Sequence, residues 1–302
     1  MQQTVTSPIE FEGVGLHSGQ QIRMVLKPAQ IDTGIVFVRT DIHDKDNVIP
    51  AHWDLVVQSQ LCTRIHNEDD VSVGTVEHLM AALRGCGVDN VVIEIDGPEV
   101  PVMDGSAQPF VDEIDLIGVS AQGKARRAIK ILKTITVEEN GKKVSLSPSA
   151  QSVFSGSIDF DHPVIGRQDY AITLVNGNFR HDLADCRTFG FLHEVEAMHK
   201  MGLALGGSLD NAIVLDHDRV LNNSGLRRED EFIRHKLLDA IGDLFLAGYP
   251  IIGEYYGEKF SHALNNQLLR TLFEDRDAWI FVDGATSAEQ KAPVQPCLHE
   301  MA

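Results

Sequence analysis

Alternating apolar and polar residues in the first part of the chain predict strands, and a helical repeat separates two of them. Runs rich in β-branched residues and bounded by turn-forming residues predict strands at residues 22–28, 34–40 and 90–95. Apolar residues recur at helical spacing from Val76 to Leu83, which predicts a helix with Thr75 as its N-cap and Gly85 as its stop. Residues 109–120 predict a second helix of the same kind.

The second part of the chain repeats this alternation after a polar break at residues 123–127. Strands are predicted at residues 128–139, 142–148, 154–163, 170–177 and 210–220. Helices are predicted at residues 193–204 and 228–248. These patterns predict an α+β fold of two similar domains, at residues 1–122 and 127–283, followed by a loose tail at residues 284–302.

Composition narrows the class of protein. The chain has 302 residues, of which 26 are Lys or Arg and 44 are Asp or Glu, so its formal charge of −18 disfavours nucleic-acid binding. It contains neither a secretory signal pattern nor an apolar run that would span a bilayer. The four cysteines are far apart and form no CxxC motif, which is typical of a reducing compartment. We therefore predict a cytoplasmic protein without an integral membrane segment.

The helix predicted at residues 228–248 carries the strongest chemical signal. His235, Asp239 and Asp243 are spaced by four residues and therefore share one side of the helix. A His and a carboxylate one turn apart can hold a divalent cation, because both donors project from a rigid element toward a common point. The alternative is an ordinary ion pair on a solvated face, and this helix considered alone favours that alternative.

Glu77 and His78 form a second candidate pair in the first turn of the helix predicted after Thr75. A metal-binding His beside a free carboxylate suits metal-assisted hydrolysis, in which the cation acidifies water and the base removes its proton. Adjacent side chains on a helix point about 100° apart, so the two would not approach a metal from the same direction. Each residue also has a structural explanation, because Glu77 can compensate the helix dipole and His78 can be a surface residue.

His262, before an Asn-rich segment, is the third candidate. If His262 faces the same cleft, it can protonate a leaving nitrogen while Asp243 keeps it charged. Otherwise it is a turn or capping residue, and spacing does not decide between the two roles.

Other known motifs do not match this sequence. The histidines at 193 and 199 lack HExxH spacing, and residues 13–19 miss the dinucleotide-binding fingerprint. Neither a P-loop nor a GxSxG elbow occurs, which argues against nucleotide-cofactor redox chemistry and serine hydrolysis.

Seven motifs in chain order resemble one family. They are GVGLHSG (13–19), TVEHL (75–79), VPVMDGSAQPF (100–110), RTFGF (187–191), LGGSLDNAIV (205–214), DEFIRHKLLDAIGDL (230–244) and SHALNN (261–266). Together they closely resemble the UDP-3-O-acyl-N-acetylglucosamine deacetylases of lipid A synthesis in Gram-negative bacteria, over about residues 4–283. The resemblance implies two α+β domains whose helices lie between two outer sheets.

The resemblance also implies roles for individual residues. The implied metal ligands are His78, His235 and Asp239, which would hold one Zn²⁺ per chain, with Fe²⁺ as an alternative in the cell. The implied catalytic groups are Glu77 as general base, His262 as acid with Asp243 as its partner, Thr188 at the oxyanion, and Lys236 near the reacting substrate. The implied substrate is UDP-3-O-acyl-N-acetylglucosamine, bound by a monomer.

Two further groups of residues are implied to contact this substrate. Contacts to the sugar or the UDP portion are expected from Phe160, Phe189 and Lys259. An insert at residues 193–214 is expected to form a hydrophobic passage for the acyl chain, with walls from Leu192, Val195, Ala204, Ser208 and Val214. For any single wall residue, packing of the helix onto the protein is the better explanation.

Three positions depart from the usual pattern of the family. Ser261 replaces a common glycine, Gln60 a common methionine and Cys186 a common alanine. These differences leave every implied ligand and catalytic group in place, so they bear on acyl preference and rate. Two alternative functions stay open: a metal hydrolase of a different amide or ester, and a catalytically idle paralogue that binds a nucleotide sugar.

Overall fold

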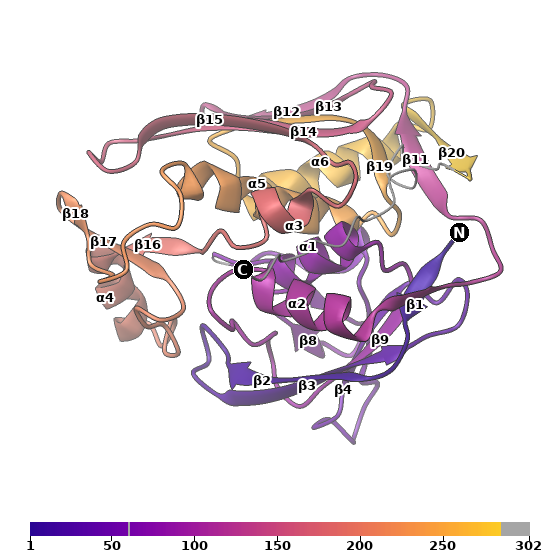
Figure 1. Cartoon of the computed structure of the whole chain (residues 1–302), viewed down its shortest axis with the longest axis horizontal. Coiled ribbons are helices and arrows are strands. Elements are labelled where there is room, and N and C mark those ends of the chain that lie inside the picture. The colour runs from indigo at the N-terminus through magenta and orange to yellow at the C-terminus, as the bar shows by residue number, and fades with distance from the viewer. Residues whose placement is uncertain (60, 285–302) are drawn as a thin grey trace, which may run out of the picture.

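Two β-sheets enclose the long helices of the protein between them (Figure 1). The structure is a computed structural model that describes residues 1–59 and 61–284. In Figure 1 the first half of the chain forms the lower sheet, the second half forms the upper sheet, and both contribute helices to the layer between. This arrangement confirms the predicted α+β class. The domain limits at residues 122 and 127 remain a prediction.

The lower sheet has the strand order β2-β3-β9-β4-β5, antiparallel except between β4 and β9. Its strands are β2 (Ile9–Val14), β3 (Gln21–Pro28), β4 (Ile35–Arg39), β5 (Val48–Pro50) and β9 (Val91–Ile95). In β3 the residues Ile22, Met24 and Leu26 are buried, so one face of the sheet covers the core. The strands predicted at residues 22–28, 34–40 and 90–95 are confirmed.

The upper sheet has seven strands in the described part of the chain, with the order β12-β13-β19-β11-β20 and with β14 and β15 attached through β19. Its strands are β11 (Arg127–Ile131), β12 (Ile135–Glu139), β13 (Lys142–Ser147), β14 (Ser152–Phe160), β15 (Gly166–Thr173), β19 (Ile251–Glu258) and β20 (Trp279–Asp283). Smaller sheets pair β1 (Gln3–Val5) with β10 (Val119–Ala121) and join β6 (Val56–Val57), β7 (Arg64–His66) and β8 (Ser72–Val73). A third small sheet joins β16 (Phe189–Phe191), β17 (Ile213–Asp216) and β18 (Arg219–Val220).

Helices from both halves meet in the middle layer. They are α1 (Glu77–Cys86), α2 (Gln108–Ile117), α3 (Phe179–Asp182), α5 (Glu231–Phe245) and α6 (His262–Glu274), whereas α4 (Leu192–Lys200) lies beside β16–β18 at the left edge of Figure 1. A single 3₁₀ turn, η1 (Trp53–Leu55), follows β5. Helices α1 and α5 approach so closely that a Cβ atom at Gly242 would lie 2.0 Å from the carbonyl oxygen of Glu77. Glycine at this position therefore permits the contact between the two halves.

The predicted limits of the first helix are wrong at both ends. Thr75 does not cap α1, because its hydroxyl donates to Glu99 Oε2 at 3.2 Å, and Val76 takes the N-cap position without a side-chain bond. Gly85 does not stop α1, which ends at Gly87 in the left-handed region (φ 73°). The N-terminal boundary depends on the contact with Glu99, which is distant in the sequence, and the C-terminal boundary depends on the left-handed backbone of Gly87.

Several other predicted elements are shortened or divided. The helix predicted to residue 120 ends at Ile117, and the following residues form β10 against β1. The strand predicted at 128–139 is divided into β11 and β12, and the one at 210–220 is the hairpin β17–β18. The helices predicted at 193–204 and 228–248 are shorter, as α4 and α5. The residue pattern within one segment does not show which strand pairs with it or where a turn divides it.

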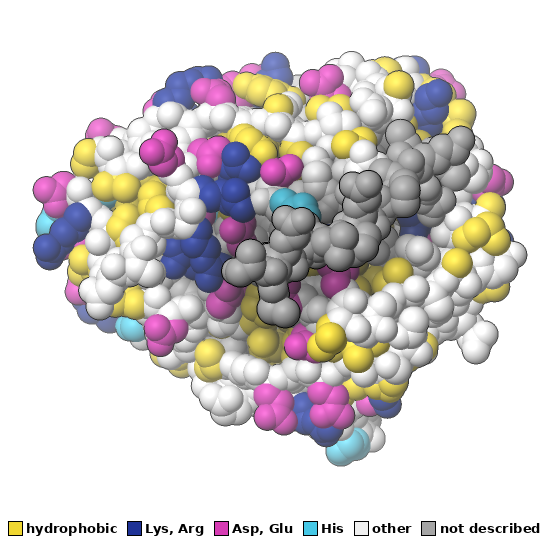
Figure 2. Space-filling model, viewed as in Figure 1, with side chains coloured by type: hydrophobic (Ala, Val, Ile, Leu, Met, Phe, Trp, Pro, Cys, Tyr) yellow, Lys and Arg dark blue, Asp and Glu magenta, His cyan; other side chains and the backbone are white. Residues whose placement is uncertain are grey.

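The described surface carries charges of both signs. Figure 2 shows acidic and basic side chains interspersed over one face of the molecule. No helix among residues 1–59 and 61–284 is long and apolar enough to cross a membrane. Cys62, Cys86 and Cys186 are buried free thiols. The predictions for Gln60, for Cys297 and for the tail from residue 285 onward lie outside the described residues.

Candidate metal centre and active site

His78, His235 and Asp239 converge where α1 meets α5. The Nε2 atoms of the two histidines are 2.9 Å apart, and Asp239 Oδ1 is 3.4 Å from His78 Nε2. One donor atom from each residue lies within 4.8 Å of the other two, and the three residues are only 3–5% exposed. The interpretations of His235 and Asp239 as a solvated pair and of His78 as a surface residue are therefore wrong.

The polar atoms of this cluster fit a divalent cation. Asp239 Oδ1 is buried without a hydrogen-bond partner among the described residues, which is costly unless a ligand satisfies such an atom. Burial lowers the pKa of His235 to about 3, so the imidazole is neutral. Burial opposes ionisation of Asp239, but electrostatic attraction from the adjacent His235 ring and the Lys236 ammonium outweighs it and lowers the pKa of that carboxyl. Neutral imidazoles and an ionised carboxylate are the donors of a catalytic zinc site.

Glu77 lies beside this cluster but is held by other groups. Its Oε2 accepts a hydrogen bond of 3.0 Å from the backbone N–H of Thr63, and its Oε1 is 3.7 Å from His262 Nε2. Burial raises the pKa of Glu77, although the positive charges of His262 and His78 oppose the rise. A fixed carboxylate with a raised pKa is suited to take a proton.

His262 is the first residue of α6 and faces Glu77 from the opposite side. Ser261 is the N-cap of α6, and its hydroxyl accepts from the backbone N–H of Leu264 at 3.5 Å, so the departure at this position supplies a helix cap. His262 Nδ1 lies 2.8 Å from Asp243 Oδ2. Burial lowers the pKa of His262, but Asp243 and Glu77 outweigh it and raise the value to about 9. The imidazole is therefore protonated at neutral pH.

Asp243 lies behind His262 and is fixed on both oxygens. Its Oδ1 accepts from the Thr63 hydroxyl at 2.5 Å and its Oδ2 from Asn265 Nδ2 at 2.8 Å. Asn265 in turn accepts from the Tyr255 hydroxyl at 2.7 Å. This network holds the carboxylate in one orientation toward the imidazole.

These groups open into one cavity of about 610 Å³. One end of its lining is polar and comprises Glu77, His78, Thr188, His235, Lys236, Asp239 and His262. The other end is mainly apolar and comprises Phe160, Phe189, Leu192, Val195, Ala204, Ser208 and Val214 together with Phe191, Met198, Leu209, Ala212 and Leu221. The cavity therefore combines a reactive end with a wall that suits a hydrocarbon chain.

Of the predicted site residues, Asp243 lies behind His262 and does not line this cavity, and neither does Lys259. Its Nζ lies 3.3 Å from Asp159, and both side chains are about half exposed beside Phe160. Conversely, the cavity includes His17, whose two ring nitrogens are buried without a hydrogen-bond partner among the described residues. The GVGLHSG motif contains His17, but its spacing assigned no role to that side chain.

Known proteins with the same sequence pattern belong to one family. The family model described as UDP-3-O-acyl N-acetylglycosamine deacetylase matches residues 2–274. A UDP-3-O-acyl-N-acetylglucosamine deacetylase of Phenylobacterium zucineum is 51% identical over 92% of this chain and 95% of its own length. Enzymes of the same name from Acidithiobacillus ferrooxidans and Shewanella violacea are 48% and 46% identical, each over 97% of this chain and 95% of their own length. The chain therefore belongs to the UDP-3-O-acyl-N-acetylglucosamine deacetylase family, whose members are metal-dependent amide hydrolases.

Proposed function

We propose that this protein hydrolyses the N-acetyl group of UDP-3-O-acyl-N-acetylglucosamine, giving acetate and UDP-3-O-acyl-glucosamine, the committed step of lipid A synthesis. The observation that carries the proposal is the convergence of two imidazoles and a carboxylate, from both halves of the chain, at the polar end of a half-apolar cavity. The names of the relatives support the choice of substrate.

His78, His235 and Asp239 would hold one Zn²⁺. Two imidazoles and a carboxylate favour zinc, and ferrous iron tolerates a similar set. When bound, the cation supplies Lewis acidity toward the amide carbonyl and lowers the pKa of water. The unpartnered Oδ1 atom of Asp239 supports this assignment, since a cation would satisfy it.

Glu77 and His262 would divide the proton transfers between them. Glu77 would take a proton from the attacking water, and Thr63 holds the carboxylate in place for that step through its backbone N–H. His262 would give its proton to the departing nitrogen, because Asp243 and Glu77 keep the imidazole charged. The two side chains face each other, Oε1 to Nε2, across 3.7 Å, which suits a base and an acid that act on one substrate group.

Thr188 and Lys236 would act on the carbonyl side of the substrate. Both side chains line the cavity beside the cluster, and Lys236 Nζ is 3.3 Å from Asp239 Oδ2. The Thr188 hydroxyl would donate to the oxygen that gains negative charge, and the ammonium group of Lys236 would add positive potential there.

The substrate's remaining parts would occupy the rest of the cavity. Phe160 and Phe189, whose ring centroids are 5.8 Å apart, would contact the sugar or the UDP portion, with Lys259 at its outer side. The acyl chain would lie along the walls formed by Leu192, Val195, Ala204, Ser208 and Val214. We further propose that the protein acts in the cytoplasm and as a monomer.

Acetate release from UDP-3-O-acyl-N-acetylglucosamine tests the proposal. The purified protein, its chelator-treated form and the chelated form resupplied with Zn²⁺ are compared, with Glu77→Gln as a variant that keeps all three metal ligands. We expect acetate from the untreated and resupplied proteins, and a loss of about 100-fold or more in the metal-loaded Glu77→Gln variant. Turnover only of other amides indicates a different hydrolase, and binding without release indicates an idle paralogue.

A further inference from the structure

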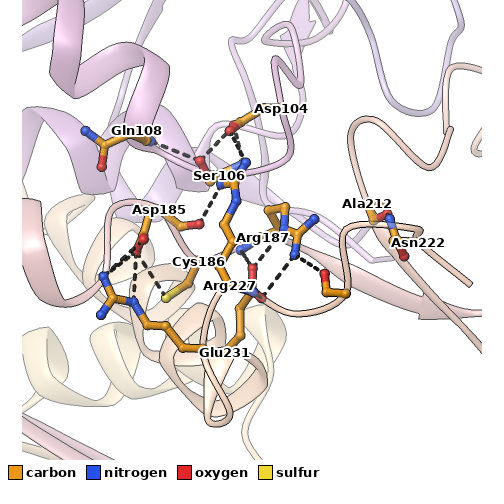
Figure 3. Close-up of polar contacts among 12 residues, drawn as sticks. Asp104, Ser106, Gln108, Asp185, Cys186, Arg187, Ala212, Asn222, Arg227 and Glu231 are labelled. Atoms are coloured by element: carbon orange, nitrogen blue, oxygen red, sulfur yellow. Dashed lines mark hydrogen bonds and ion pairs between the residues drawn. The ribbon is translucent and has the colours of Figure 1, made fainter. Parts of the chain in front are cut away.

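A buried ion pair involves Arg187, the residue before Thr188. Glu231, in the first turn of α5, is fully buried, and Arg187 is 5% exposed. Glu231 Oε1 accepts from Arg187 Nε at 2.9 Å and from the backbone N–H of Arg187 at 3.1 Å. Its Oε2 accepts from Arg187 Nη2 at 3.2 Å and from the backbone N–H of Arg227 at 2.7 Å. Figure 3 shows Arg187 against this carboxylate, while the side chain of Arg227 extends toward Asp104.

The residue that follows Arg187 is held on both sides of its backbone. The N–H of Thr188 donates to the carbonyl of Gly105 at 2.8 Å, and the carbonyl of Thr188 accepts from Ile213 at 2.8 Å. At Gly105, a Cβ atom would lie 2.1 Å from the carbonyl oxygen of Asn211, so the loop fits only with glycine. By contrast, the Thr188 hydroxyl makes no hydrogen bond with any described residue and lines the cavity. The backbone is anchored while the hydroxyl is left available.

A second ion pair, between Arg227 and Asp104, links the Arg187–Glu231 pair to the first half of the chain. Arg227 Nη2 donates to Asp104 Oδ2 at 2.8 Å, and Arg227 Nη1 donates to the carbonyl of Asp185 at 2.7 Å (Figure 3). Asp104 is oriented by the hydroxyl of Ser106 at 2.7 Å. Both partners of the Arg227–Asp104 pair are about one third exposed, so this pair can be removed without leaving a buried charge.

The energetics indicate a role other than stability. A fully buried ion pair gains little net stability over an apolar pair, whereas its fixed hydrogen bonds enforce one geometry. Glu231 stands four residues, about one turn, before His235 on the rigid helix α5. A carboxylate on the metal-cluster helix therefore sets the position of the segment that carries Thr188.

We propose that Arg187 and Glu231 are positioning residues that place the Thr188 hydroxyl relative to the His78–His235–Asp239 cluster. The Arg227–Asp104 ion pair would support them by linking this segment to the first half of the chain. The proposal rests on the proposed deacetylase function. In that reaction, a displacement of about 1 Å at an oxyanion donor lowers turnover by about 100-fold.

A double-mutant cycle on the zinc-loaded protein tests the positioning role. Glu231→Gln keeps the shape of the side chain and removes its charge, and Thr188→Val removes the hydroxyl to be positioned. We expect Glu231→Gln to lower kcat about 100-fold while KM changes less than about threefold and zinc stays at one per chain. In the Thr188→Val background the same substitution should have almost no effect on kcat, because the two residues act as a unit.

Two further measurements keep the test decisive. The three-bond methyl couplings of Thr188, measured by NMR, should report one χ1 rotamer in the native protein and an average over rotamers in Glu231→Gln. Where Glu231→Gln does not fold, the Arg227→Gln variant, which changes a side chain that is about one third exposed, should lower kcat by about 3- to 10-fold, again only when Thr188 is present. As a matched control, Asp230→Asn removes the Asp230–Arg234 pair at the same end of α5 and should leave kcat within about twofold.

Equal losses of kcat with and without the Thr188 hydroxyl, or an unchanged Thr188 rotamer, would overturn the positioning role. A native protein that releases no acetate would instead refute the proposed function, so the two failures are distinguishable.

Discussion

The two ends of the cavity are built in opposite ways. At the polar end, each of Glu77, His78, His235 and Asp239 is at most 5% exposed, and the four side chains come from the packed helices α1 and α5. At the apolar end, α4 contains no buried residue, and short strands complete the wall. The polar end is fixed by the packing of two buried helices, and the apolar end is shaped by side chains that are partly open to solvent.

The difference follows from what each end must contact. Buried charges are tolerated only with fixed partners, so the polar end has one arrangement, and a change there alters the reaction itself. Apolar contacts have no direction and scale with the area removed from water, so a change at the apolar end alters which substrate fits. Substitutions at the two ends should therefore separate chemical steps from chain selection.

The largest effect is expected from Asp239→Ala. A catalytic metal site with three protein ligands has none to spare, so zinc retention should be lost and turnover should fall by about 1,000-fold or more. Metal analysis and acetate release measure the two effects on the same sample. Asp218→Ala, at an exposed aspartate of the β17–β18 hairpin, is the control and should keep both. A variant of Asp239 that retains stoichiometric zinc and full activity would contradict the assignment.

The next effect concerns pH and the charge of His262. The groups that face this imidazole are Glu77 from α1 and Asp243 and Asp239 from α5, and Asp243 raises its pKa most. As an acid, His262 works only when protonated, so activity should decline as pH rises through about 9. Asp243→Asn removes the main cause of the raised pKa. The alkaline decline should then move to lower pH, and kcat at neutral pH should fall about 100-fold.

The pH dependence of kcat/KM, together with a ring ¹⁵N titration of His262, measures this shift. Asp70→Asn is a matched control, because Asp70 lies 3.5 Å from His66 in an exposed pair that is remote from the cavity. An alkaline decline at the same pH in the native and Asp243→Asn proteins would remove His262 from the role of acid.

A smaller effect is expected where the two halves of the polar end meet. A Cβ atom at Gly242 would lie 2.0 Å from the Glu77 carbonyl oxygen, so Gly242→Ala must push α1 and α5 apart. We expect a loss of about 3 kcal/mol in the free energy of unfolding and a fall in Tm of about 6 °C. Turnover should fall about tenfold, since the shift is below the 1 Å that costs about 100-fold. Gly123→Ala, at an open position, should change neither calorimetric Tm nor turnover.

The sequence predicted the polar end better than its surroundings. The ridge of His235, Asp239 and Asp243 follows from helical spacing within one element, and the structure confirms that the three lie on α5. Their burial did not follow, because it depends on α1, which lies more than 140 residues earlier in the chain. Spacing also left His262 undecided, since its proximity to Asp243 requires α6 to pack beside α5.

Errors in the predicted elements have the same origin. Thr75 has a side chain that can serve as an N-cap, but its hydroxyl donates a hydrogen bond to Glu99 instead. Gly85 resembles a helix stop, yet a Cβ atom there would lie 2.2 Å from the ring of Phe179, so close packing explains the glycine. His17 belongs to no periodic pattern, and only the folded chain brings it to the cavity. Local patterns specify which groups are available, and long-range packing decides which of them meet.

The smallest effect is expected at the apolar end, from Val195→Phe. Val195 is half-buried on α4 and lines the cavity, so a larger side chain should shorten the space for an acyl chain. Exclusion of about one methylene from the wall corresponds to ~0.8 kcal/mol, or roughly a fourfold loss in kcat/KM for long-chain substrates. Substrates with short acyl chains should be hydrolysed at the native rate, because the polar end is unchanged.

Competition between long- and short-chain substrates in one reaction measures this preference directly. Ala197→Phe places the same ring on an exposed position of the same helix and should leave the ratio unchanged. If Val195→Phe slowed both substrates equally, the apolar end would be coupled to the chemistry, and the contrast between the two ends would fail. A change confined to the long chain would show that acyl selection is separable from the buried charges that carry the reaction.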